Sequence, residues 1–157
     1  NIYGGEVGVD EVNRMYNGAN VNISTTLGEG CGLSLIEAQA AGTPSIAPKN
    51  SAIPEMLRDT GWLVDNITVV NQALDNAHMR PVVDVSKMRE ALEDAYSQWK
   101  EAGKGKIVDQ KCIENVHEHF KWDDKREQLQ EIFKEVLEVK STQRSPGTNP
   151  NLKLHKV

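Results

Sequence analysis

The sequence predicts an α/β fold in which a parallel sheet of short strands is flanked by helices. Short runs of β-forming and small residues occur at 21–25, 45–47 and 61–64, and segments with helical spacing of apolar residues lie before and between them. A glycine-rich turn, residues 28–32, joins the first run to the helix that follows. Strand, glycine-rich turn and helix in this order are typical of parallel α/β sheets.

The first half of the chain supplies the elements around this turn. Apolar residues at helical spacing predict an amphipathic helix over about 9–19, with Met15 and Tyr16 packed in the core. The helix after the turn, about 32–41, is apolar on most sides, which predicts burial against the sheet. The charged Glu37 inside it would then need a ligand hydroxyl or a fixed hydrogen bond.

Glycine and proline indicate where the next elements begin and end. Gly42 is a natural C-terminal cap for the helix at about 32–41, and Pro44 cannot continue a helix. Beyond the second strand, Asn50 or Ser51 is expected to cap the next helix, with Pro54 in its first turn.

The segment after the third strand is predicted to be irregular. Residues 65–85 read as a loop, and no chemistry is assigned to them. A helix then begins at Asp84 or Ser86 and presents one apolar face. That face consists of Met88, Leu92, Ala95, Tyr96 and Trp99.

The C-terminal part of the chain is predicted to be helical and then disordered. One helix is expected over about 107–118, and a last helix carries an apolar stripe through about residue 139. Residues 141–157 have no periodicity and are expected to form a disordered tail. The predicted organisation is therefore one partial domain, 1–140, followed by the tail.

Composition excludes several classes of function. A net charge of −5 argues against a general nucleic-acid or anionic-membrane surface. No apolar run approaches the ~20 residues that span a bilayer, and no signal peptide is visible. Cys31 and Cys112 lack metal-site spacing and are expected to be reduced thiols in a cytoplasmic protein. His117 and His119 would point to different faces of a helix, so no metal site is expected.

Residues 28–38 carry the chemistry that the sequence predicts. Glycines at alternate positions of the turn let the backbone approach a ligand, and the free N–H groups at the start of a helix attract an anion. Glu29 lies in the turn and Glu37 more than a turn into the helix. Amides suit a phosphate and the two carboxylates suit hydroxyl groups, so together they predict a sugar-nucleotide site.

These residues resemble the donor-binding C-terminal domain of a retaining glycosyltransferase with the GT-B fold, of family 4, also described as glycosyl transferases group 1. That family carries E-G-F-G-L followed by E-A-x-A-x-G-x-P. From Glu29 to Pro44 this chain has the whole pattern, except that Cys31 stands where the family has Phe. The resemblance implies a Rossmann-like parallel sheet and a domain that lacks its N-terminal part, since residues 1–5 already read as a strand and its exit turn.

The resemblance also implies roles for individual residues. Glu29 would face the hydroxyls of the donor sugar as the catalytic-site residue, and Glu37 would hold the nucleotide ribose. The turn at Gly30, Cys31, Gly32 and Leu33 would bind the donor, with the amides of the last two on its diphosphate.

The expected reaction is transfer from a UDP-, GDP- or ADP-sugar with retention, without a metal or other cofactor. The acceptor is not identified. The chain alone is expected to be inactive, because the acceptor side and the basic diphosphate ligands belong to the absent part. Peripheral membrane association through an N-terminal domain is compatible with the resemblance.

Two other interpretations remain open. The chain could be a non-catalytic module that binds a nucleotide or sugar phosphate, which a Met codon close to Asn1 would favour. It could also belong to another Rossmann-like sugar enzyme, such as an epimerase or a relative of glycogen phosphorylase. An upstream dinucleotide fingerprint or a lysine cofactor site would favour that class.

Overall fold

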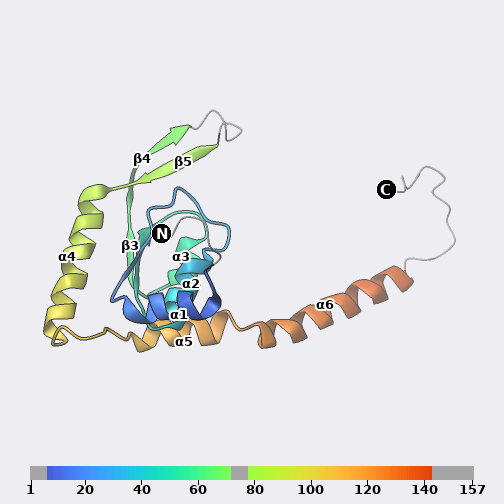
Figure 1. Cartoon of the computed structure of the whole chain (residues 1–157). Coiled ribbons are helices and arrows are strands. Elements are labelled where there is room, and N and C mark those ends of the chain that lie inside the picture. Colours follow the sequence, from blue (N-terminus) through green and yellow to red (C-terminus); the bar gives the residue numbers. More distant parts are fainter. Residues whose placement is uncertain (1–6, 72–77, 143–157) are drawn as a thin grey trace. The chain divides into compact units, whose positions relative to one another are not determined.

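The structure is a computed structural model that describes residues 7–71 and 78–142 (Figure 1). The chain divides into two compact units, residues 1–120 and residues 121–157. The predicted strand and turn at 1–5, and the predicted tail beyond residue 142, lie outside the described residues.

A parallel sheet of three strands forms the centre of the first unit. The strands are β1 (Asn22–Ile23), β2 (Ser45–Pro48) and β3 (Trp62–Val64), in the order β1-β2-β3. Both pairs are parallel, with Ile23 opposite Ile46 and Ile46 opposite Trp62. The predicted α/β fold with a parallel sheet is confirmed.

Helices cover both faces of this sheet. On one face lie α2 (Leu33–Ala40) and α3 (Ile53–Leu57), with α5 (Gln110–His119) against α2, and on the other lies α4 (Val85–Glu101). The pleat of β2 divides the core between them, because successive side chains of a strand point to opposite faces.

Two apolar clusters result from this alternation. Ile46 packs with residues of α4, among them Met88 and Ala95. Ala47, the next residue of β2, packs with Leu35 of α2 and with residues of α3. The sheet is therefore the middle layer of three.

Glycine is required where β3 begins. Gly61 has a φ of +66°, and a Cβ built on it would lie 2.2 Å from the backbone oxygen of Ser45. Any side chain at this position would push β3 away from β2.

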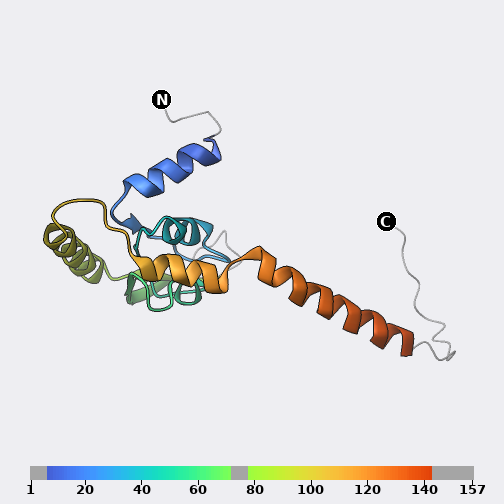
Figure 2. The same ribbon diagram turned by 90° about the horizontal axis from the view of Figure 1, so that it is seen from below.

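Helix α1 (Val9–Gly18) forms where it was predicted, but its packing was predicted wrongly. None of its residues is buried, and Met15 is 65% exposed. Figure 2 shows α1 standing off the sheet, and the contacts of the structure place it against α2. Periodicity showed which residues share a face of α1, but that face meets α2 only in part, so none of its residues is buried.

Lys106 holds the C-terminal end of α1. Its ammonium donates hydrogen bonds to the backbone oxygens of Tyr16 and Ala19 and to the hydroxyl of Thr43, 2.5 Å away. Partial burial lowers the pKa of Lys106. These bonds satisfy carbonyls that the end of a helix leaves without partners.

The segment predicted to be a loop, 65–85, contains a β-hairpin instead. Strand β4 (Asn66–Asn71) pairs antiparallel with β5 (Met79–Val83), with Val70 opposite Arg80. Figure 1 shows the hairpin leaving the end of β3 and leading into α4. Most residues of β4 are exposed, so the alternating burial that reveals a strand in sequence is missing.

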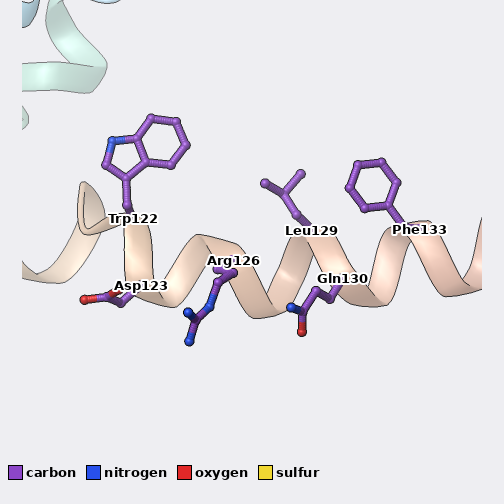
Figure 3. Close-up of a pocket in the computed structure, with 6 residues that line it drawn as sticks. All are labelled: Trp122, Asp123, Arg126, Leu129, Gln130 and Phe133. Carbon is purple, nitrogen blue, oxygen red and sulfur yellow. The ribbon is translucent and has the colours of Figure 1, made fainter.

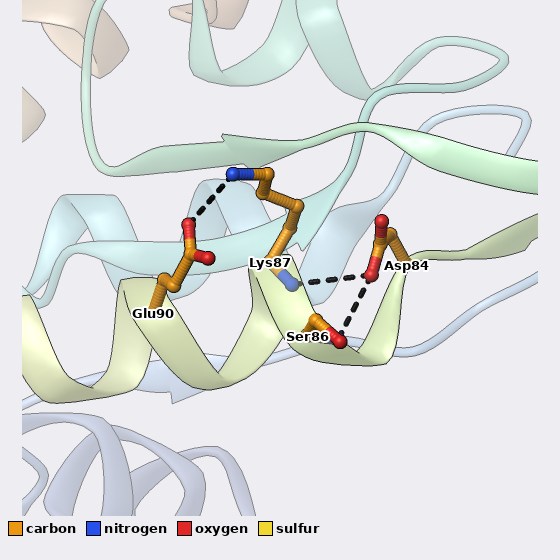
Figure 4. A network of polar contacts seen from close by, with 4 residues as sticks. All are labelled: Asp84, Ser86, Lys87 and Glu90. Carbon is orange, nitrogen blue, oxygen red and sulfur yellow. Dashed lines mark hydrogen bonds and ion pairs between the residues drawn. The ribbon is translucent and has the colours of Figure 1, made fainter.

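Helix starts were predicted with mixed success. Asp84 is the N-cap of α4, as expected, and its carboxylate accepts hydrogen bonds from the amides of Ser86 (2.8 Å) and Lys87 (3.2 Å) (Figure 4). Asn50 and Ser51 do not cap α3, whose N-cap is Ala52 without a side-chain bond. Ser51 bonds the glycine-rich turn instead.

The second unit contains α6 (Trp122–Thr142). The predicted apolar stripe is present and exposed, with Phe133 at 62%. Within residues 7–71 and 78–142, no helix is both long enough and apolar enough to cross a bilayer.

Candidate functional site

The predicted site lies at the carboxyl ends of the parallel strands. Residues 24–32 leave β1, residues 49–52 leave β2, and the hairpin β4–β5 follows β3. In open α/β sheets, ligands bind in the crevice outside these strand ends. Three segments that are separate in the sequence therefore meet at one edge of the sheet.

Hydrogen bonds fix the start of the glycine-rich turn. The Thr26 hydroxyl donates to the backbone oxygen of Gly28 (3.0 Å) and accepts from its amide (3.3 Å). The amide of Glu29 donates to Oγ of Ser51 (2.8 Å), and the Ala52 amide donates to the oxygen of Glu29 (3.4 Å). The loop after β2 thus holds the backbone of Glu29 in place.

The turn ends in a left-handed residue that starts α2. Gly32 has φ 54° and ψ 48° and is the N-cap of α2, without a side-chain cap bond. Its carbonyl accepts from the amides of Leu35 and Ile36, so the helix begins regularly. Among the described residues, the amides of Leu33 and Ser34 have no hydrogen-bond acceptor. These N–H groups stand at the positive end of the helix dipole.

The structure gathers the predicted residues along one edge of α2. Glu29 is half-buried, whereas Gly30, Cys31 and Leu33 are exposed and Gly32 is buried. Glu37 follows Leu33 by one helical turn, about 6 Å along the axis, and so lies on the same face of α2.

The predicted burial of Glu37 is wrong. Helix α2 is buried only along Leu35, Ala38 and Gln39, and Glu37 is exposed. The helix is apolar nearly all round because many of its residues are small, and only one face meets the core.

Tyr16 of α1 is the neighbour of Glu37. Partial burial, the charge of the Glu37 carboxylate and a hydrogen bond to it raise the pKa of Tyr16. The contact between α1 and α2 therefore positions the carboxylate that the sequence assigned to the ribose.

Polar groups inside the core anchor α2. Gln39 is 0% exposed, and its Oε1 accepts from the hydroxyl of Thr60 (2.8 Å) and from Nδ2 of Asn115 (2.7 Å). Its Nε2 donates to the backbone oxygens of Leu35 (3.3 Å) and Met56 (3.1 Å). Helices α2, α3 and α5 are tied together beneath the site.

Sequence reasoning missed two residues of the loop after β2. Ser51 has a φ of +43°, unfavourable for a residue with a side chain, and donates to Oδ1 of Asn50 (3.1 Å). Asn50 is 8% exposed, and its Nδ2 has no acceptor among the described residues. The bond of Ser51 to Glu29 was not detectable in the sequence, because the two residues are 22 positions apart.

Sequence reasoning also missed Arg80, on β5. A Cβ added at Gly28 would lie 2.9 Å from Nη1 of Arg80, so the guanidinium packs against the glycine-rich turn. No sequence pattern signals this contact, because it depends on the register of the hairpin.

Two hollows elsewhere do not include the predicted residues. One, of about 390 Å³, lies along α6, where Trp122, Leu129 and Phe133 project from one side of the helix (Figure 3). Another, of about 430 Å³, lies between β3 and α4 and is lined by charged residues such as Lys87 and Glu90. In the part of the chain that the structure describes, no cluster of three or more His, Cys, Asp or Glu residues could hold a metal ion.

The fold and the site together define an α/β unit with a parallel sheet and a glycine-rich turn at its carboxyl edge, as in a fragment of the Rossmann-like GT-B fold. Residues 2–79 match the family described as Glycosyl transferases group 1. The matched segment contains the whole glycine-rich turn and both predicted carboxylates.

A solved structure supports the fold. The chain is similar to sucrose-phosphate synthase from Thermosynechococcus elongatus, with a TM-score of 0.60 and 22% sequence identity. The similarity covers 80% of this chain and 27% of that protein, so the chain spans about a quarter of its length. Among curated proteins, none matches the chain.

Proposed function

We propose that the chain is the donor-binding part of a glycosyltransferase that transfers a sugar from a nucleotide diphosphate sugar with retention. The observation that carries this proposal is the match of residues 2–79 to glycosyl transferases group 1, which includes the glycine-rich turn from Glu29 to Leu33. The position of this turn at the carboxyl edge of the sheet supports it.

In this proposal the backbone binds the donor diphosphate. The amides of Gly32 and Leu33, in the turn with Gly30 and Cys31, donate to phosphate oxygens at the N-terminus of α2. The bond to the anomeric carbon breaks as negative charge builds on the leaving diphosphate, so donors fixed in advance stabilise the transition state. No metal or other cofactor is required for this role.

The two carboxylates orient the rest of the donor. Glu29 accepts hydrogen bonds from the sugar hydroxyls. The bond from its amide to Oγ of Ser51 fixes the backbone from which this carboxylate extends. Glu37, exposed on α2 next to Tyr16, accepts from the ribose hydroxyls. Fixing the sugar and the nucleotide at separate points holds the anomeric carbon in position for attack.

Calorimetric titration of the 157-residue chain with UDP, GDP and ADP tests the proposal. One nucleotide should bind, and Glu37→Ala should weaken it by about tenfold to a hundredfold, as expected when charge-assisted hydrogen bonds are lost. Glu114→Ala, which removes an exposed glutamate of α5, is the matched control and should leave the affinity unchanged. A folded chain that binds none of the three, or equal binding by Glu37→Ala, would contradict the proposal.

A further inference from the structure

We infer that Arg80 of the β4–β5 hairpin binds a phosphate group of a substrate held at the glycine-rich turn. The inference rests on the proposed function and adds to it a cationic ligand from a segment to which the sequence assigned no chemistry.

The hairpin places Arg80 at the site edge of the sheet. It follows β3 directly, and its register sets Arg80 opposite Val70. The Nη1 atom lies 2.9 Å from where a Cβ of Gly28 would be, so glycine at this position is what admits the guanidinium. Arg80 is half-buried, which limits the positions that its side chain can take.

The chemistry of the guanidinium suits a phosphate. It carries five N–H donors in a planar fork that matches the oxygens of a phosphate, and a phosphate contact would add to the interaction that Arg80 already makes within the chain. Gly28 is the residue before Glu29 and opens the turn whose far end presents the unengaged amides of Leu33 and Ser34. A phosphate in the turn would meet the guanidinium from one side and the helix N-terminus from the other.

Asn50 supports the presence of a ligand acceptor nearby. Its Oδ1 is bonded to Ser51, which in turn binds the amide of Glu29, so its side chain lies next to the turn. Its buried Nδ2 lacks an acceptor within the described residues. Buried donors are normally satisfied, and an oxyanion bound in the turn would be an acceptor close to this one.

The first experiment measures affinity in Arg80→Ala. The nucleoside diphosphate that binds wild type should bind Arg80→Ala about 10- to 100-fold more weakly, the loss expected for one charge-assisted hydrogen bond. The corresponding nucleoside, which has no phosphate, should lose less than twofold. Arg80→Lys keeps the positive charge without the planar fork. Its affinity for the nucleoside diphosphate should lie between those of wild type and Arg80→Ala. Arg89→Ala is the control, because Arg89 is exposed on α4 and paired with Glu93.

Glucose 6-phosphate is the second ligand, and it distinguishes the two sources of a phosphate. A loss confined to the nucleoside diphosphate assigns the contact to the donor, and a loss confined to the sugar phosphate assigns it to an acceptor. Either result supports the inference. The inference would be overturned if Arg80→Ala bound both the nucleoside diphosphate and glucose 6-phosphate within twofold of wild type. It would also be overturned if Arg80→Ala lost as much affinity for the nucleoside as for the nucleoside diphosphate.

A second pair of variants tests the contact with Gly28. Gly28→Ala should push the guanidinium aside and weaken binding of the nucleoside diphosphate severalfold. When Gly28→Ala is added to Arg80→Ala, the affinity should change little further. Independent, multiplicative losses would overturn the inference. If Arg80→Ala has no effect while Glu37→Ala abolishes binding, only the inference fails. If no nucleotide binds to wild type, the proposed function fails with it.

Discussion

Replacing Gln39 with leucine should destabilise the first unit by about 3 kcal/mol. The side chain is 0% exposed and joins Thr60, Asn115 and Met56 by hydrogen bonds of 2.7–3.1 Å. Leucine fills a similar volume, so the loss comes mainly from hydrogen bonding and little from a cavity.

The magnitude follows from the partners that remain. The Thr60 hydroxyl has a single proton and can donate it to the oxygen of Leu57 (2.6 Å) when Oε1 of Gln39 is absent, and Asn115 keeps one N–H on the oxygen of Met56 (2.9 Å). The other N–H of Asn115, a residue 7% exposed, is left buried without an acceptor. An orphaned donor costs about 1–3 kcal/mol and each lost bond about 1 kcal/mol, partly offset by the apolar side chain.

Urea unfolding followed by circular dichroism measures this loss. A decrease of about 3 kcal/mol should lower the midpoint by roughly 1–3 M at ordinary m-values. Gln98→Leu, on the exposed face of α4, is the control and should stay within about 0.5 kcal/mol of wild type. The double variant with Asn115→Leu should lose less than the sum of the single losses. Strict additivity, or a loss below about 1 kcal/mol for Gln39→Leu, would refute the reasoning.

Four further predictions concern the site and its surroundings. Ser51→Gly should be more stable in urea than Ser51→Ala by about 1 kcal/mol, because both lose the bond to Glu29 but only glycine relieves the φ of +43°. A thiol reagent should modify only Cys31 in the folded chain and both cysteines in urea, since Cys112 is buried. Burial chiefly raises the pKa of Cys112 from 9.0 to about 12, so its contribution to stability is present below about pH 9 and should be lost as the pH rises to about 12. Glu37→Gln should lower the pKa of Tyr16 toward 10.0, measured by phenolate absorbance against Tyr16→Phe, because one cause of the raised pKa is the Glu37 charge.

The sequence predicted the elements whose pattern is local. Gly42 ends α2 with a φ of +69°, and Asp84 caps α4 through its carboxylate, because both signals act within a few residues. The three strands were found because each is a short run of β-forming or small residues that follows a predicted helix. The start of α2 directly after the glycine-rich turn was likewise predicted, at about residue 32, and the structure has it at Leu33.

What was missed depends on partners distant in the sequence. Strand β4 contains the β-forming run Ile67–Val70, but most of its residues are exposed. Strand β5 contains Pro81, which lacks the backbone N–H that a strand residue donates to its neighbour. The exposure of Met15 and of Glu37 had the same origin, since periodicity identifies a face but not what covers it. Ser51 was assigned to the nearer helix because its actual partner, Glu29, is 22 residues away.

The charges of the proposed site explain why a cation from the hairpin matters. Glu29 and Glu37 repel the diphosphate that the same site must hold, and two like charges 6 Å apart near a protein surface repel by about 3 kcal/mol at an effective dielectric constant of 20. The dipole of α2 supplies only about half a positive charge. In the inference drawn above, the guanidinium of Arg80 beside Gly28 is the further source of positive charge. Because the guanidinium offsets the carboxylates without replacing them, the site can keep acceptors for hydroxyls and still attract a phosphate. Substitution of Arg80 should therefore lower the affinity for ligands that carry a phosphate far more than the affinity for nucleosides.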